Sequence, residues 1–247
     1  VLLLRYSCNP LVIMSCCNAF YQLSTASKFK DSRFPEALFR VYSITESEGI
    51  RATILQSILL YARIDITLFC NQSQHFFLLP SDQGKTASLK LEILSILVNK
   101  SNVKKILHEL KYYILYSQSE QTILTSIDAL IECANTSLEL ENHIMRWLIK
   151  IMESTQLSPK VLDGFVNVIR KIIITNPLRH MKIILKLANI LETHSDMADN
   201  ARAGLIWLFG EMTKVEFRIC PDILRRLVTS FTSEGTESRN AIILFAA

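Results

Sequence analysis

The residues best suited to chemistry are a glycine-lysine-threonine run and a histidine-glutamate pair. Gly84, Lys85 and Thr86 resemble the end of a phosphate-binding loop, in which backbone N–H groups and a lysine hold nucleotide phosphates. The complete signature needs a glycine five positions before Gly84, where Leu79 stands, and a preceding strand, where the local pattern is helical. We therefore interpret the run as the start of a helix and expect no bound cofactor.

The pair His108-Glu109 is the type of motif that metal-dependent HEAT-repeat enzymes project from successive repeats onto a di-iron centre. It occurs only once here, because no other histidine precedes an acid. One pair cannot supply the roughly four to six ligands of such a centre. No serine-nucleophile elbow or H-E-x-x-H helix is present either. We assign no catalytic, cofactor-binding or metal-binding residue and expect a protein that is not an enzyme.

The cysteines do not form a metal-binding or disulfide pattern. None stands in a C-x-x-C pair, and most lie on apolar helical faces, which predicts buried cytosolic thiols. The six are Cys8, Cys16, Cys17, Cys70, Cys133 and Cys220.

One stretch carries an excess of basic residues. Between Lys160 and Lys186 there are six bases against one acid, Asp163. Such a stretch suits an anionic membrane surface or an acidic partner, but bases on different sides of two helices would merely be solvated. Of the two interpretations, we favour the solvated face. The net charge of +4 over the whole chain is too small to indicate a nucleic-acid partner.

The elements that must carry these residues are helices, because an apolar triplet spaced i, i+3, i+4 recurs along the whole chain. This spacing places three side chains on one face of a helix. The triplets recur at intervals of 34 to 40 residues, which is the period of helix-pair repeats. Their first members are Cys17, Leu55, Ile93, Ile127, Phe165, Leu205 and Ile243.

Several other signals support helix pairs. Pro10, Pro35, Pro159, Pro177 and Pro221 each stand at the start of an amphipathic run, where proline is favoured. Second helices show a single apolar stripe, which is continuous from Val103 to Ile114 in one repeat. Small residues precede three successive triplets and predict close helix packing. These residues are Ser126, Gly164 and Gly204.

The chain is therefore predicted to be all-α, an α-solenoid of about six to seven HEAT/armadillo-like helix pairs over residues 1–247. No apolar run approaches the roughly 20 residues needed to span a bilayer. Both ends lie inside the apolar pattern without polar capping repeats, so we expect a single solenoid segment truncated at both ends, an internal fragment of a longer trunk.

Several segments resemble the β-adaptins, the large β chains of vesicle-coat adaptor complexes, over essentially the whole chain. Three match adaptin motifs: Asn9–Met14, Ser81-Asp82 with Leu89–Leu94 (LKLEIL), and Trp207–Glu211 (WLFGE). Two more, Pro221–Arg226 and Ser230–Glu234, resemble in particular the β chain of adaptor complex 3. Met212 and the Ile131–Ala134 helix end depart from the family pattern, which indicates a divergent, fungal-like member.

The resemblance implies a scaffold rather than an enzyme. It implies a heterotetramer with a second large chain, a medium chain and a small chain, recruitment by an Arf-type small GTPase, and sorting of membrane cargo from Golgi or endosome to lysosome or vacuole. It also implies a cytoplasmic location, peripheral on Golgi and endosomal membranes and on coated vesicles. It identifies no partner-binding residue, because cargo pockets in this family lie largely on other subunits.

The main alternative is a karyopherin-like transport receptor, which is also built of HEAT repeats. That class would need acidic inner surfaces for basic cargo, whereas this chain is mildly basic. The sequence therefore favours the adaptor scaffold.

Overall fold

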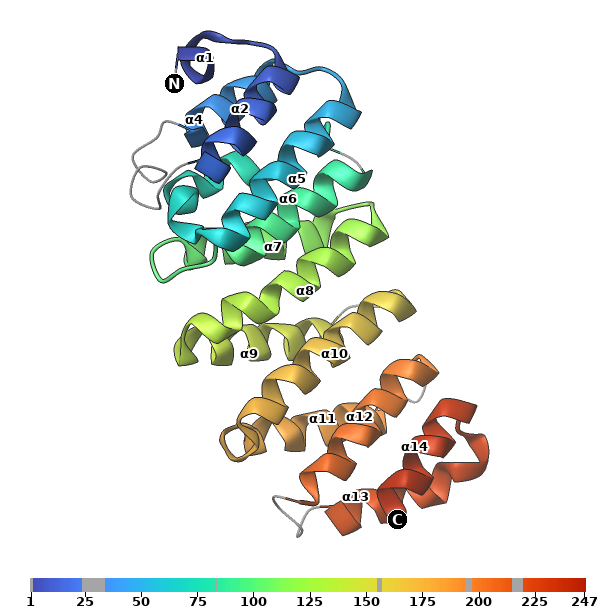
Figure 1. The fold of residues 1–247 in the computed structure, drawn as a ribbon. Helices are drawn as coiled ribbons and strands as arrows, with labels where there is room; N and C mark the ends of the chain where they lie inside the picture. The colour runs from blue at the N-terminus through green and yellow to red at the C-terminus, as the bar shows by residue number, and fades with distance from the viewer. Residues whose placement is uncertain (1, 24–33, 83, 155–156, 194–196, 215–219) are drawn as a thin grey trace. The chain divides into compact units, whose positions relative to one another are not determined.

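The computed structural model describes residues 2–23, 34–82, 84–154, 157–193, 197–214 and 220–247. Every regular element in those ranges is a helix, and no strand occurs there. The all-α prediction is thus confirmed (Figure 1). The chain divides into two compact units, unit 1 over Val1–Cys133 and unit 2 over Ala134–Ala247.

Unit 1 begins with short helices and ends in long ones. Its elements are α1 (Leu2–Tyr6), α2 (Pro10–Leu23), α4 (Phe34–Ile44), α5 (Glu48–Ile64), the 3-10 helices η1 (Ile66–Leu68) and η2 (Cys70–Phe76), α6 (Gly84–Ile96), α7 (Val103–Tyr116) and α8 (Glu120–Thr136), of which residues up to 133 belong to this unit.

The repeat that contains α5 departs from a simple helix pair. Its second member is formed by η1 and η2, whose Phe69 and Phe76 are buried. Their rings pack with Phe34 and Phe39 of α4 at centroid distances of 5.4–6.3 Å. Large aromatic side chains thus fill the space beside two short 3-10 helices.

Unit 2 is more regular. Its elements are α9 (Leu138–Ser154), α10 (Pro159–Thr175), η3 (Pro177–His180), α11 (Met181–Thr193), α12 (Asp199–Met212), α13 (Cys220–Ser230), η4 (Phe231–Ser233) and α14 (Thr236–Ala246). The first helices α10, α12 and α14 pack in succession, and the second helices α9 and α11 pack on each other. This is the stacking of a solenoid, in which each repeat contacts its neighbours.

The predicted triplets form the core in both units. Leu55, Ile58 and Leu59 of α5 are all buried, as are Phe165 in α10 and Leu205 in α12 with their triplet partners. The α7 stripe from Val103 to Ile114 is buried as predicted. Prolines 10, 35, 159, 177 and 221 each occupy the first or second position of a helix, which confirms the predicted starts.

The triplets at the two ends of the chain were wrong in part. In α2 only Cys17 of the first triplet is buried, because the core face centres on Ile13 and Cys17. In α14 the buried side chains are Ala241, Ile242 and Phe245, whereas Ile243 is 57% exposed. The register differs because residues 241–247 are all apolar, so periodicity alone does not single out one face of α14. The face that is buried places Phe245 beside Gly210 of α12.

Candidate interaction surfaces

The glycine-lysine-threonine run is the start of a helix, as predicted. Gly84 is the first residue of α6 and has a φ of 53°, a conformation that glycine adopts without strain. His108 is exposed on α7, and Glu109 accepts a hydrogen bond of 2.9 Å from the Tyr113 hydroxyl. No group of three metal-ligating side chains is found among the described residues.

The LKLEIL segment contains a buried ion pair. Lys90 Nζ lies 2.5 Å from Asp82 Oδ2, and each side chain is only 1% exposed. The same ammonium donates to the Phe77 carbonyl at 3.3 Å and lies 5.5 Å from the centroid of the Tyr42 ring. The Asp82 carboxylate also accepts from the Leu79 N–H at 2.8 Å. The pair therefore holds residues 77–82 against α6.

The WLFGE segment is held by a stacked arginine. The Arg170 guanidinium of α10 lies 4.1 Å from the centroid of the Trp207 ring in α12. Close packing of these helices requires Gly204, because a Cβ at that position would lie 2.9 Å from Val166 Cγ1. Close approach at Gly204 was predicted from its place before the triplet, and it is confirmed.

A second buried ion pair joins consecutive repeats of unit 2. Arg202 of α12 donates to both carboxylate oxygens of Glu234, at 2.5 and 2.7 Å, and to the Leu191 carbonyl of α11 at 2.7 Å. Ser230 donates to Glu234 at 2.8 Å. The bonds from Arg202 lower the pKa of the Glu234 carboxyl, so it stays ionised despite its burial.

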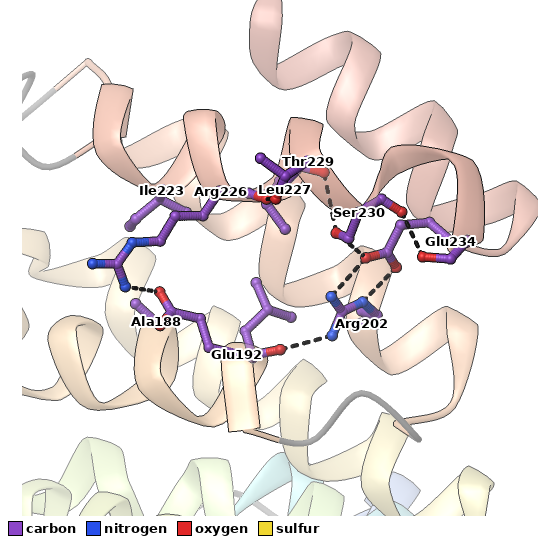
Figure 2. Close-up of a pocket in the computed structure, with 11 residues that line it drawn as sticks. Ala188, Glu192, Arg202, Ile223, Arg226, Leu227, Thr229, Ser230 and Glu234 are labelled. Atoms are coloured by element: carbon purple, nitrogen blue, oxygen red, sulfur yellow. Dashed lines mark hydrogen bonds and ion pairs between the residues drawn. The ribbon is translucent and has the colours of Figure 1, made fainter.

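This network forms one side of a hollow of about 440 Å³ (Figure 2). On its other side, Arg226 of α13 is ion-paired with Glu192 of α11. Apolar side chains such as Leu191 and Ile223 line the space between them. The charged residues that line the hollow in the described chain, Glu192, Arg202, Arg226 and Glu234, are already paired with one another, so they offer no unpaired charge to a ligand.

A hollow of about 750 Å³ lies in unit 1 beside the Lys90 pair. Leu79 and Pro80 line one side, and Tyr112 and Tyr116 of α7 line another. The two tyrosine rings lie 5.0 Å apart and are 56% and 68% exposed. This hollow is therefore an open aromatic surface beside residues 77–82, which the Lys90–Asp82 pair holds against α6.

The cysteine prediction is confirmed in part. None of the six forms a disulfide in the part of the chain that the structure describes; Cys17, Cys133 and Cys220 are buried, but Cys8 is exposed. Burial raises the pKa of Cys17 and of Cys133 to about 12, which keeps these two as unreactive thiols.

The bases of the 160–186 stretch separate into two kinds. Arg170 is half-buried on Trp207 and has a structural role. Lys171 in the last turn of α10, Arg179 in η3, and Lys182 and Lys186 in α11 are exposed. Four of the six therefore lie around the turn between two consecutive helices.

The buried ion pairs Lys90–Asp82 and Arg202–Glu234 were not predicted. Arg202 stands between two alanines, and Lys90 stands between two leucines. A charged residue on a core-facing position needs a buried partner, which was the available signal. Its partner could not be chosen from sequence, because Glu234 lies 32 residues from Arg202.

No helix in the described ranges is long and apolar enough to cross a membrane.

Comparison with known families shows one match over almost the entire chain. The model of the adaptin N terminal region matches residues 2–246. The AP-3 complex subunit beta of Saccharomyces cerevisiae is 45% identical over 99% of this chain and 30% of its own length. The same subunit of Eremothecium gossypii is 40% identical, with 31% of its length covered.

More distant and structural matches agree. The AP-3 complex subunit beta-1 of Homo sapiens is 28% identical over 94% of this chain and 20% of its own length. A homology model of the full-length AP-3 complex in an intermediate open conformation contains a chain that is 45% identical. That chain matches with a TM-score of 0.81 over 98% of this chain and 39% of its own length. The chain thus spans about a third of the length of the fungal relatives.

Proposed function

The chain belongs to the adaptin N-terminal family, and on that premise we propose that it is a scaffold segment of the large β subunit of an AP-3-type adaptor complex. It would have no catalytic activity of its own. Its partners would be a second large chain, a medium chain and a small chain. The complex would sort membrane cargo from Golgi or endosome to lysosome or vacuole.

One observation carries this proposal: 45% identity to an AP-3 β subunit extends over 99% of the chain. Several residues that make the buried contacts described above lie in the motif segments. Lys90 stands in LKLEIL, Trp207 and Gly210 in WLFGE, and Glu234 ends the segment that begins at Ser230. A scaffold needs such residues, because function in a solenoid depends on the shape and surface that the stacked repeats present.

Location and recruitment follow from the same premise. We propose that the full-length protein is cytoplasmic and lies peripherally on Golgi and endosomal membranes and coated vesicles. Recruitment would depend on an Arf-type small GTPase. Support for both comes from the family to which the chain belongs.

The proposal is tested by purifying the full-length tagged protein from its own cells and identifying what accompanies it by mass spectrometry. We expect the three other adaptor subunits in equal amounts. A subunit set that lacks medium and small adaptor chains, or enrichment of a nuclear-transport GTPase instead, would refute it.

A further inference from the structure

The turn between α10 and α11 in unit 2 exposes bases and apolar side chains together. The bases are Lys171, Arg179, Lys182 and Lys186. The apolar side chains are Ile174, Leu178 and Leu185, which are 49%, 69% and 47% exposed. The short helix η3 packs against both α10 and α11, so the three elements form one continuous region. We call these seven residues the turn surface (Figure 1 shows the turn at the edge of unit 2).

The four bases of the turn surface differ from the exposed arginines of α13, which are ion-paired. Arg225 pairs with Asp222 at 3.1 Å, and Arg226 pairs with Glu192. None of the four turn-surface bases forms an ion pair with any residue that the structure describes. Their charge is thus not neutralised within the described chain and is available to an anionic partner.

Acidic residues are sparse around this surface. Asp163 is the single acid between Lys160 and Lys186, and it stands eight residues before Lys171 on α10. Helix α9, which packs against α10 and α11, exposes Arg146 and Lys150 along its middle and Glu139 and Glu153 near its ends. Its Glu141 is buried, and its carboxylate lies 2.5 Å from His180 Nε2 of η3, so this acid faces inward and not toward the exposed bases. The local field is therefore positive, and it attracts anions at distances up to about the Debye length of 8–10 Å.

The apolar side chains decide which anionic partner fits. Leu178, 69% exposed, stands next to Arg179 on a helix of four residues at a turn, so an apolar side chain projects among the bases. Lysine and arginine interleaved with leucine and isoleucine suit the boundary between lipid headgroups and acyl chains. A folded acidic protein would instead need carboxylates at fixed positions, whereas these bases are spread over three elements.

We propose that the turn surface binds the anionic phospholipids of a bilayer, with the four bases at the headgroups and Leu178 at the acyl boundary. This rests on the proposed function insofar as an adaptor scaffold works beside a membrane. It adds a direct lipid contact in this part of the trunk.

Vesicle co-sedimentation of the full-length protein in its complex tests the proposal. The vesicles contain phosphatidylcholine with 30% phosphatidylserine, or phosphatidylcholine alone, and no protein. Each base near an anionic surface contributes about a five-fold factor in affinity. We expect Lys182→Glu/Lys186→Glu to weaken binding to the anionic vesicles by at least about 30-fold, and Leu178→Ser to weaken it by about five- to ten-fold.

The matched control is Lys104→Glu/Lys105→Glu on α7, which changes the charge equally at exposed positions of unit 1. It should retain binding within about two-fold, since the effect depends on local rather than net charge. Unchanged binding of Lys182→Glu/Lys186→Glu overturns the proposal. The proposal is also overturned if this variant still binds vesicles but no longer assembles with another adaptor subunit, because the surface would then be a protein contact.

The outcomes also separate this proposal from the proposed function. If the parent protein assembles with the other adaptor subunits but neither turn-surface variant changes vesicle binding, only the lipid contact is refuted. If the parent protein does not assemble with those subunits, the adaptor function fails whatever the vesicles show. Circular dichroism of each variant should match the parent, because all five substituted side chains are exposed.

Discussion

Units 1 and 2 hold their family motifs in place with different kinds of buried ion pair. In unit 1, Lys90 and Asp82 lie eight residues apart, and the pair fixes a loop to the helix that follows it. In unit 2, Arg202 and Glu234 lie 32 residues apart, and the pair joins one repeat to the next. The lysine is a point charge that bonds one oxygen of its carboxylate, whereas the arginine fork bonds both oxygens of Glu234 and, in addition, the Leu191 carbonyl.

The two pairs stabilise different parts of the scaffold, one a loop and the other the contact between repeats. The loop over residues 77–82 must be held close to its own helix, which a short local contact achieves. Successive repeats must be kept in a constant arrangement, which requires a group that reaches three elements. Arg202 does so, because it bonds the α11 carbonyl of Leu191 and the Glu234 carboxylate from its position on α12.

The largest effect is expected from breaking the more deeply buried pair. Lys90→Met leaves the Asp82 carboxylate charged at 1% exposure, which should cost about 3–5 kcal/mol of local unfolding free energy. Arg202→Met leaves Glu234 at 6% exposure with its Ser230 bond and should cost about 3 kcal/mol. Hydrogen exchange of the amides in residues 77–96 and 199–230 measures the two losses.

The control is the double variant Asp82→Leu/Lys90→Met, which removes both charges together. It should recover much of the loss, since paired apolar replacement of a buried ion pair is often neutral. An equal loss in the single and double variants would mean that packing, not charge, is what Lys90 contributes.

Small residues before the triplets should respond differently in the two units. Gly204→Ala in unit 2 would bring a Cβ to 2.9 Å from Val166 Cγ1, and we expect a net cost of about 1–2 kcal/mol despite the better helix propensity of alanine. Ser126→Ala in unit 1 removes only a 2.7 Å bond to the Thr122 carbonyl and should cost at most about 1 kcal/mol. Thermal unfolding of both variants checks this order, and a milder effect at Gly204 would contradict the close packing.

Two glycines at helix starts, Gly235 before α14 and Gly49 in α5, should respond to alanine in opposite directions. A Cβ at Gly235 would lie 2.2 Å from Asp199 Cγ, whose carboxylate accepts from the Glu237 and Ser238 N–H groups at the start of α14. Gly235→Ala should therefore cost about 1 kcal/mol through this cap. Gly49 of α5 has nothing within 4 Å, so Gly49→Ala should stabilise by up to about 1 kcal/mol. Opposite signs in thermal unfolding are the expected outcome.

Acid should weaken the unit 2 pair gradually, and this is the smallest expected effect. The pKa of Glu234 is lowered from its usual 4.5, mainly by the bonds from Arg202, so the unfolded state takes up the proton first. The stabilisation is present above about pH 4.5 and is lost as the pH falls through the folded-state value.

The variant Glu234→Gln tests that assignment. It should be less stable than the parent at pH 7 and should lose less stability between pH 5 and pH 3, as measured by hydrogen exchange corrected for intrinsic rates. Asp199, whose pKa its bonds from Ser238 also lower, will leave a residual acid dependence. An unchanged slope in Glu234→Gln would contradict the role of the pair.

Much of this fold is predictable because burial imposes a period on each helix. The faces of α5, α7, α10 and α12 follow their apolar stripes, and the proline positions mark helix starts. Residues 66–76 form 3-10 helices that do not follow such a stripe, because their aromatic side chains pack against the rings of α4 and not along one helical face. The predicted register of α14 was wrong because residues 241–247 are all apolar, so the sequence does not show which face packs against α12.

The sequence alone determined that the chain is a stack of helix pairs of the adaptin kind, because apolar periodicity and motif segments are local properties of the chain. It also identified the bases between Lys160 and Lys186 as an unusual stretch. Only the tertiary structure decided that Arg170 stacks on Trp207 while the four turn-surface bases stay exposed. Likewise it alone paired Lys90 with Asp82 and Arg202 with Glu234, because a partner for a buried charge is chosen by distance in space.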